Sequence, residues 1–213
     1  MEITWYGHAC FRLRDRNVTI ITDPYGPDIG YTLPRMRADI VTVSHGHADH
    51  SYVAGVKGKP RVLNGPGEYE IGGVFITGIS TYHDKKKGAE RGKNTAFLFE
   101  FDGLSVCHLG DLGHIPTQSQ AAVLSQVNVL LIPVGGVSTI NAAQAAEVVS
   151  LLEPQIVIPM HYKTKALNIK LDSVSKFLKA MGLGKLPEQD TLKVTASNLP
   201  EETQVMLLSY KQA

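Results

Sequence analysis

The sequence lacks several features that would place it in particular protein classes. No apolar run approaches the ~20 residues that a membrane-spanning helix needs. The N-terminal stretch MEITWYGHACFRLRD has neither the basic start nor the long apolar segment of a signal peptide. The chain has only two cysteines, Cys10 and Cys107, both beside expected strands, so we expect reduced, buried thiols rather than a disulfide. Together these absences favour a cytoplasmic protein without a membrane partner.

The chain also lacks a strong charge of either sign. Its formal net charge is +1, so we expect no nucleic-acid partner. Hydrophobic residues make up 43% and charged residues 19% of the 213 residues, the profile of an ordinary globular protein. Because no low-complexity segment or long linker divides the chain, we expect a single domain over residues 1–213.

Short β-rich runs dominate the first half, and apolar strands alternate with helical patterns in the second. Expected strands cover residues 2–7, 9–14, 17–23, 38–44, 60–64, 128–134 and 155–160, with hairpins over 67–80 and 94–111. Expected helices cover residues 117–127, 141–153 and 171–182, and residues 191–210 suggest a closing strand pair. This order of elements predicts an α/β fold in which two sheets pack together with helices outside.

One stretch, IVTVSHGHADHSY at residues 40–52, concentrates potential metal ligands. His45, His47, Asp49 and His50 follow directly after an expected buried strand. Strand ends fix the position of the loops they feed, and imidazole and carboxylate groups are preferred ligands of zinc and similar divalent ions. A single histidine is more often a surface or hydrogen-bonded core residue, but burying the whole group without a shared partner would be costly. The cluster therefore predicts a metal site.

Four neighbouring residues cannot complete two coordination shells, so distant residues have to contribute. Three candidates each follow an expected strand: His83 after GVFITGISTY, Asp111 after LSVCHLG and His161 after QIVIPM. Of these, His83 has no local motif of its own.

HGHADH, the separate His83, the GD of HLGDLGH and the terminal His of PMHYK resemble the metallo-β-lactamase superfamily. WYGHACFRLR and IPMHYKT are similar to its ascorbate-6-phosphate lactonase-like branch. The resemblance runs from Glu2 to about Thr164 and implies a four-layer αβ/βα sandwich of two mixed β-sheets flanked by helices.

The same resemblance implies a ligand set for two ions. One ion would be held by His45, His47 and His83, the other by Asp49, His50 and His161, and Asp111 would bridge both. Nitrogen and carboxylate donors suit Zn²⁺ without excluding Mn²⁺ or Fe. Two such ions would activate a shared hydroxide, with Asp49 and Asp111 as the catalytic carboxylates.

Four further residues are candidates for supporting roles, each with an alternative. His8 lies near the metals in the branch, or is a hydrogen-bonded structural histidine. Asp23 resembles the aspartate that orients a ligand histidine, or belongs to the turn before Pro24. Tyr162 would donate to an oxyanion or pack, and Lys163 is a candidate anion contact.

The implied activity is metal-dependent hydrolysis of a small ester, lactone or phosphoester. The lysine-rich segment HDKKKGAERGKN favours an anionic substrate, although its alternative is a solvated, mobile loop. A non-haem iron redox protein handling oxygen or sulfur compounds on the same fold is the second interpretation, and a metal-stabilised scaffold the third. Base rates favour a closed homo-oligomer.

Overall fold

The computed structural model describes residues 1–16, 18–125 and 127–213, and contains two large mixed β-sheets. The first sheet has the order β15-β1-β2-β3-β5-β7. Its strands are β1 (Glu2–Trp5), β2 (Phe11–Asp15), β3 (Val18–Thr22), β5 (Ile40–Thr42), β7 (Arg61–Leu63) and β15 (Leu192–Lys193). β1, β2 and β3 alternate in direction, whereas β3, β5 and β7 are parallel. The carboxyl ends of β1, β3 and β5 therefore lie at one edge of this sheet.

The second sheet has seven strands in the order β16-β13-β12-β11-β10-β9-β8. They are β8 (Gly67–Ile71), β9 (Val74–Tyr82), β10 (Lys93–Phe101), β11 (Leu104–His108), β12 (Val129–Pro133), β13 (Ile156–Met160) and β16 (Gln204–Val205). The hairpins β8–β9 and β10–β11 are antiparallel, and β11, β12 and β13 are parallel. Here the carboxyl ends of β9, β11 and β13 lie at a common edge.

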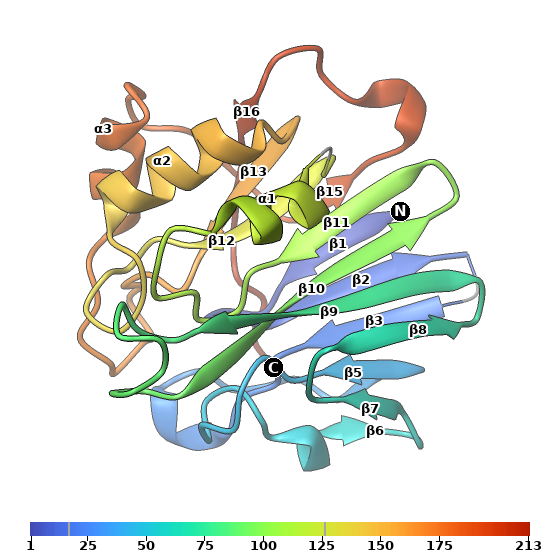
Figure 1. The fold of residues 1–213 in the computed structure, drawn as a ribbon. Coiled ribbons are helices and arrows are strands. Elements are labelled where there is room, and N and C mark those ends of the chain that lie inside the picture. The colour runs from blue at the N-terminus through green and yellow to red at the C-terminus, as the bar shows by residue number, and fades with distance from the viewer. Residues whose placement is uncertain (17, 126) are drawn as a thin grey trace.

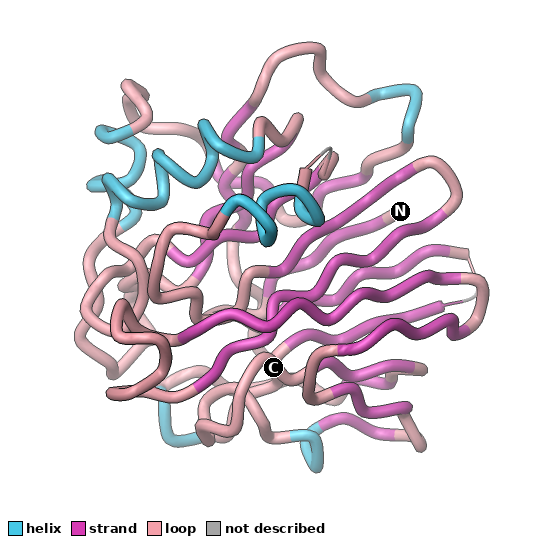
Figure 2. Tube along the Cα trace, viewed as in Figure 1, coloured by secondary structure: helices cyan, strands magenta, loops and turns pink. Residues whose placement is uncertain are grey.

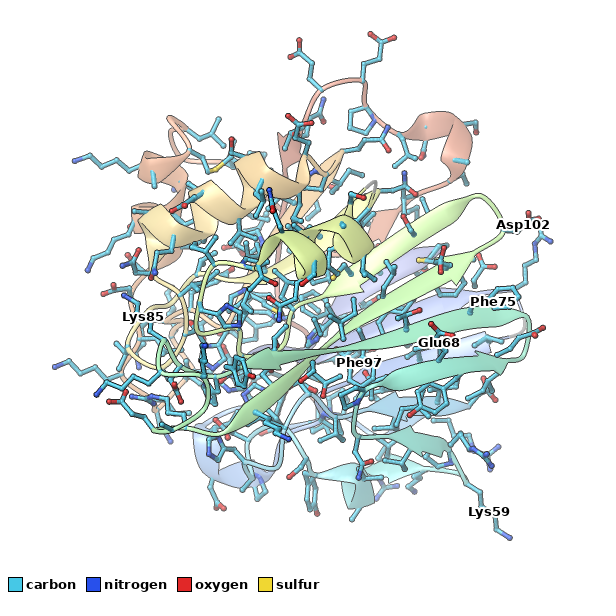
Figure 3. The ribbon with its side chains drawn as sticks, in the orientation of Figure 1. Lys59, Glu68, Phe75, Lys85, Phe97 and Asp102 are labelled. Atoms are coloured by element: carbon cyan, nitrogen blue, oxygen red, sulfur yellow. The ribbon has the colours of Figure 1, made fainter. Side chains whose placement is uncertain are left out.

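The two sheets pack face to face around one large hydrophobic core (Figures 1 and 2). Phe11 and Leu13 from the first sheet and Phe97 and Phe99 from the second are all fully buried there. Figure 3 shows Phe97 inside the molecule, whereas Lys59 and Lys85 extend outward. The continuous apolar runs of β12 and β13 are buried throughout, as strands covered on both faces require. Cys10 and Cys107 are buried free thiols, as predicted.

Three α-helices cover the outer face of the second sheet near β11–β13 (Figure 1): α1 (Gln118–Leu124), α2 (Ala142–Leu152) and α3 (Val174–Ala180). Capping boxes at Thr117 and Asn141 start α1 and α2. The predicted start of this helix at residue 171 is wrong, because α3 begins at Val174. The backbone of Asp172 instead donates to Gly135 O and accepts from Lys163 N, which ties it to two other loops. The predicted strand 17–23 and helix 117–127 include Asn17 and Gln126, which lie outside the described residues.

The outer face of the first sheet is covered differently. Its cover consists of residues 24–38, the 3₁₀ turns η1 (Pro27–Ile29) and η2 (Val53–Gly55), and the short pair β4 (Met36–Arg37) and β6 (Val56–Lys57). Tyr25, Tyr31 and Leu167 fill a second hydrophobic core there. Prolines and glycines recur through residues 24–38, which explains why this cover contains short turns rather than α-helix.

The prediction of a closing strand pair within residues 191–210 is wrong. β15 pairs antiparallel with β1 at the edge of the first sheet, and β16 pairs parallel with β13 at the edge of the second. The remaining tail strands, β14 (Glu188–Gln189) and β17 (Leu207–Leu208), pair in parallel with each other. Two-residue strands bury too few side chains to carry a periodic pattern, so the sequence gives no sign of their partners.

Among the described residues, no helix combines the length and apolar character needed to cross a membrane.

Candidate metal centre

The predicted ligands converge where the carboxyl ends of the strands meet. His83 and His161 follow β9 and β13 directly, Asp111 follows β11, and the segment 45–50 follows β5. Gly110 allows the two sheets to approach at this point. It has a φ of +55°, and a Cβ atom there would lie 2.5 Å from Asn94 Oδ1 and 2.5 Å from Ser44 Cβ. A backbone hydrogen bond of 2.8 Å from Thr95 N to Ser44 O joins the same two edges. Strand tips from both sheets therefore build one site.

Asp111 lies at the centre of the group. Its Oδ2 atom is 3.3 Å from His83 Nε2 and 4.0 Å from His45 Nε2. Its Oδ1 atom is 3.2 Å from His161 Nε2 and 3.4 Å from His50 Nε2. Each carboxylate oxygen thus faces a different pair of imidazoles, an arrangement that fits a carboxylate shared between two cations.

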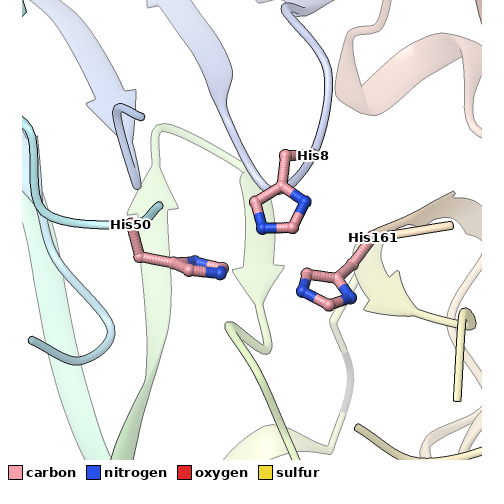
Figure 4. A group of neighbouring side chains, drawn as sticks. All are labelled: His8, His50 and His161. Atoms are coloured by element: carbon pink, nitrogen blue, oxygen red, sulfur yellow. The ribbon is translucent and has the colours of Figure 1, made fainter. Parts of the chain in front are cut away.

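The imidazoles form two groups whose potential ligand atoms lie within 4.8 Å of one another. One group is His45, His47 and His83. The other is His8, His50 and His161, whose rings converge from three separate segments (Figure 4). The His8 ring centroid is 4.2 Å from that of His161 and 4.7 Å from that of His50. Of the two interpretations of His8 offered by the sequence, the structure favours the one that places it within the site.

Asp23 sets the orientation of two of these imidazoles. His50 Nδ1 donates to Asp23 Oδ2 over 2.8 Å. Ser44 Oγ donates to the same oxygen over 2.6 Å and accepts from His45 Nδ1 over 2.9 Å. Because both Nδ1 atoms donate to these acceptors, the Nε2 atoms of His45 and His50 face the centre, where a metal ion would bind. Asp23 therefore has the orienting geometry rather than a role in the turn alone.

The electrostatics of the group also suit a cation. Burial, together with His161, lowers the pKa of His8 to about 3, and burial with His50 lowers the pKa of His45 to about 4. These imidazoles are thus neutral at pH 7, the form that binds metals. Burial would lower the pKa of His50 as well, but Asp111 and Asp23 raise it to about 9. The negative potential that holds a proton on His50 would equally attract a metal ion.

A metal ion would also give partners to some of the buried polar atoms that are otherwise unpaired. Within the described residues, six buried atoms of the group have no hydrogen-bond partner: His8 Nδ1, His45 Nε2, His50 Nε2, His83 Nδ1, Asp111 Oδ1 and His161 Nδ1. Buried polar atoms are rarely left unpaired, because each one loses its hydration. The Nε2 atoms of His45 and His50 and the Oδ1 atom of Asp111 face the centre, so the donor set fits a divalent cation.

Three residues of the site also have a strained backbone. His8, Asp23 and His161 have φ values of 52°, 39° and 52°, in the left-handed region that non-glycine residues seldom adopt. His161 N donates to His8 O over 3.0 Å, which ties two of these strained residues together. Such residues cost ~1–3 kcal/mol each and cluster at functional sites. The fold therefore tolerates strain in order to place these side chains.

Two predicted ligands border solvent. His47 is exposed, and Asp49 is half-buried with its Oδ2 atom 3.2 Å from His8 Nε2 and 3.8 Å from His50 Nε2. Asp49 is thus beside the second group of imidazoles, as the predicted ligand set requires, although its hydrogen bond goes to His8. Access to the centre is from the side of these two residues.

The predicted roles of Lys163 and Tyr162 do not agree with their contacts. The Lys163 ammonium donates to the carbonyl oxygens of Leu167 and Ile169, so it stabilises the following loop instead of reaching an anion at the site. Tyr162 is buried against Trp5, with ring centroids 5.1 Å apart, and its packing alternative describes it. The short distance from His161 in the sequence therefore did not predict where either side chain points.

The lysine-rich segment after His83 is more ordered than a mobile loop. The Asp84 carboxylate accepts four backbone hydrogen bonds of 2.7–3.0 Å, from residues 86, 88, 90 and 91. Lys86 pairs with Glu90 over 2.7 Å, while both side chains remain largely exposed. Asp84 thus closes residues 84–91 into a compact loop next to a predicted ligand.

Two orienting residues, Ser44 and Asn94, were not identified from the sequence. Ser44 links His45 to Asp23, as described above. Asn94 Oδ1 accepts from the backbone N of Asp111 over 2.9 Å, and its amide donates to Thr81 Oγ1 over 2.7 Å and Leu109 O over 2.9 Å. The position of Ser44 beside the histidine cluster was an available signal, but Asn94 lies in an ordinary strand and has none.

Asp23→Ala tests the orienting role. We expect divalent-metal affinity to fall by about 10–100-fold, because His50 loses the acceptor of its protonated nitrogen and Ser44, which accepts from His45, loses its own acceptor. The measurement is competition against a chromogenic chelator, with ¹⁵N shifts of the imidazoles to report their tautomers. Asp39→Asn is the matched control, since Asp39 also accepts a backbone hydrogen bond, from Thr19 N over 2.8 Å, but lies outside the group. Unchanged affinity and unchanged tautomers in Asp23→Ala would contradict the role.

A two-sheet α/β sandwich with histidines and aspartates gathered at its strand tips defines a metal-binding fold of the metallo-β-lactamase type. Residues 2–161 match the family described as Beta-lactamase superfamily domain, and the chain belongs to this superfamily. The predicted family and fold class are therefore confirmed, while the particular branch stays a prediction.

The relatives agree with this assignment. The crystal structure of a candidate Zn-dependent hydrolase of the metallo-β-lactamase superfamily from Thermotoga maritima has a TM-score of 0.82 and 42% sequence identity, with 99% of each chain covered. A UPF0173 protein of Pyrococcus abyssi is 32% identical over 77% of this chain and 84% of its own length. A UPF0173 metal-dependent hydrolase of Methanoculleus marisnigri is also 32% identical, over 77% of this chain and 82% of its own length.

Proposed function

We propose that the protein is a metal-dependent hydrolase that cleaves a small ester, lactone or phosphoester at a site for two divalent cations. The observation that carries the proposal is the position of Asp111, with Oδ2 3.3 Å from His83 and Oδ1 3.2 Å from His161. The Thermotoga and Methanoculleus relatives, described as a Zn-dependent and a metal-dependent hydrolase, support the same class of activity.

The donor atoms favour Zn²⁺ as the cation. Neutral imidazole nitrogens and carboxylate oxygens are its usual ligands, and Mn²⁺ and Fe remain compatible with the same set. We assign His45, His47 and His83 to one cation, His50, His161 and Asp49 to the other, and Asp111 to both. When bound, such ions supply Lewis acidity and lower the pKa of a coordinated water towards neutrality.

The protein's own side chains would orient the reacting groups. Asp23, directly and through Ser44, holds His50 and His45 with their Nε2 atoms inward. These imidazoles therefore need not reorient when the site is occupied. Asp49 binds His8 through Oδ2, and among the described hydrogen bonds its Oδ1 atom is not engaged. We assign Asp49 Oδ1 to orienting the attacking water and passing its proton to the leaving group.

The test combines metal content with hydrolysis. The protein, purified aerobically, is analysed for zinc, manganese and iron and assayed with aryl phosphodiesters, esters and lactones. We expect about two zinc ions per chain and turnover that chelation removes and Zn²⁺ restores. Iron together with oxygen-dependent substrate oxidation and no hydrolysis would replace the proposal with the redox alternative. Bound metal with neither activity would leave the scaffold interpretation. The cytoplasmic location, the homo-oligomer and the lack of a nucleic-acid partner stay predictions.

A further inference from the structure

A pocket of about 370 Å³ opens beside Asp49, on the solvent side of the candidate metal centre. Its walls include Pro27, Ile29, Ala48, Tyr52 and Ile169, with Asp49 at one end. This volume is within the range of small-molecule sites. Tyr52 is 43% exposed, so part of its side chain remains for an occupant of the pocket to bury.

The walls of the pocket are fixed by backbone hydrogen bonds between segments far apart in sequence. Tyr52 N donates to Pro24 O over 2.7 Å, and Asn168 N donates to Ile29 O over 2.9 Å. Gly30, with a φ of +94°, lets the two loops pack closely, because a Cβ atom there would be 2.1 Å from Ala166 O. The shape of the pocket is therefore fixed by contacts between η1, the segment that begins η2 and the loop after His161.

Charge on the walls restricts what the pocket can receive. Asp28 and Asp49 are the ionisable lining residues, and no described lining residue is basic. An anionic group would meet two carboxylates and no cation, whereas an uncharged apolar group would bury the exposed surface of Tyr52 and Ile169. The pocket thus selects against the anionic substituent that the lysine-rich loop suggested.

The position of Asp49 connects this pocket to the chemistry. Asp49 lines the pocket and also hydrogen-bonds His8, which lies with His50 and His161. A substrate whose reacting atom reaches Asp49 therefore extends its neighbouring group towards Tyr52 and Ile169. We propose that the pocket binds the apolar alkyl or aryl group of the substrate, so that the enzyme acts on esters, lactones or phosphoesters of apolar groups. The substrate class rests on the proposed hydrolase function, but the pocket can be tested without turnover.

The experiment measures binding of linear carboxylates from acetate to octanoate to the zinc-loaded protein by calorimetry. Signals of Ile29 and Ile169 are followed by NMR in isoleucine-methyl-labelled protein. We expect the dissociation constant to fall by about fourfold per added methylene until the pocket is filled. We also expect hexanoate, but not acetate, to shift the two isoleucine signals.

Two variants and a control identify the walls. Tyr52→Ala and Ile169→Asp should weaken hexanoate binding by at least about tenfold and leave acetate binding unchanged. Phe75→Ala is the control, since Phe75 is 55% exposed on β9 and is not a lining residue (Figure 3). Equal affinity for acetate and hexanoate, or hexanoate binding unaffected by both variants, would overturn the inference. Chain-length-dependent binding without hydrolysis of any ester, lactone or phosphoester would support the pocket and contradict the hydrolase proposal.

Discussion

Replacing Asp111 with Asn is expected to remove hydrolysis almost completely, with a loss of at least about a thousandfold in kcat/KM. Asn keeps the size of the side chain but presents an amide NH₂ where one carboxylate oxygen faces either His83 or His161, 3.3 and 3.2 Å away. A loss of this size corresponds to ~4 kcal/mol, on the scale of the charge stabilisation that metal ions supply. Metal content per chain, measured by mass spectrometry, should fall in parallel to one ion or none.

Asp102→Asn is the matched control for this substitution. Asp102 lies in the turn before β11, at the opposite end of the strand that Asp111 follows (Figure 3). This variant should keep both metal content and activity. Full activity in a folded Asp111→Asn protein, with its metal retained, would exclude Asp111 as the shared ligand and with it the proposed site for two cations.

Removing the metal is expected to lower the melting temperature by about 8–16 °C at neutral pH. A ligand present at a thousand times its dissociation constant stabilises a protein by ~4 kcal/mol, and each kcal/mol shifts Tm by about 2–4 °C in a chain of this length. The physical reason is that Asp23 and Asp111 are buried carboxylates that a bound cation would neutralise.

The size of this decrease should depend on pH. His50 has its pKa raised to about 9 in the folded chain without metal, against an ordinary value of 6.5. The folded metal-free protein therefore holds a proton that the unfolded chain has released, and its stability falls as pH rises from 6.5 to 9. A metal ion would replace that proton, so the Tm difference between zinc-loaded and chelated protein should widen across this range.

Differential scanning fluorimetry with and without EDTA, at several pH values, measures both effects. Re-addition of Zn²⁺ should restore the original Tm, and Asp111→Asn should show little response to either reagent. A Tm that is the same with and without EDTA at every pH would mean that no structurally important cation is bound.

Much of the site could be predicted because its residues follow strongly apolar strands. The buried runs of β5, β11 and β13 place the segment 45–50, Asp111 and His161 at strand ends, and strand ends of like direction share an edge. The prediction of His83 as a ligand has no local motif behind it, only the position of this residue after β9. For this residue the order of ligands in the family was the main guide.

Other features depend on contacts that a linear sequence does not encode. His8 offered two interpretations until the rings of His50 and His161 were seen beside it. Asn94 accepts one hydrogen bond from the backbone of Asp111 and anchors its own amide on Thr81 and Leu109, from within a strand whose sequence does not mark this role. Lys163 lies two residues after His161, and yet its ammonium donates to carbonyl oxygens of its own loop, at Leu167 and Ile169.

The tail of the chain has a consequence for association between molecules. Residues 192–205 supply the outermost strand of both sheets, β15 beside β1 and β16 beside β13. A protein shortened before residue 192 would leave the backbone groups of β1 and β13 without partners on two separate edges. Unpaired edges are templates for strands of other chains. The short C-terminal strands therefore cover part of these two edges, and we expect a chain without them to associate with other copies more readily.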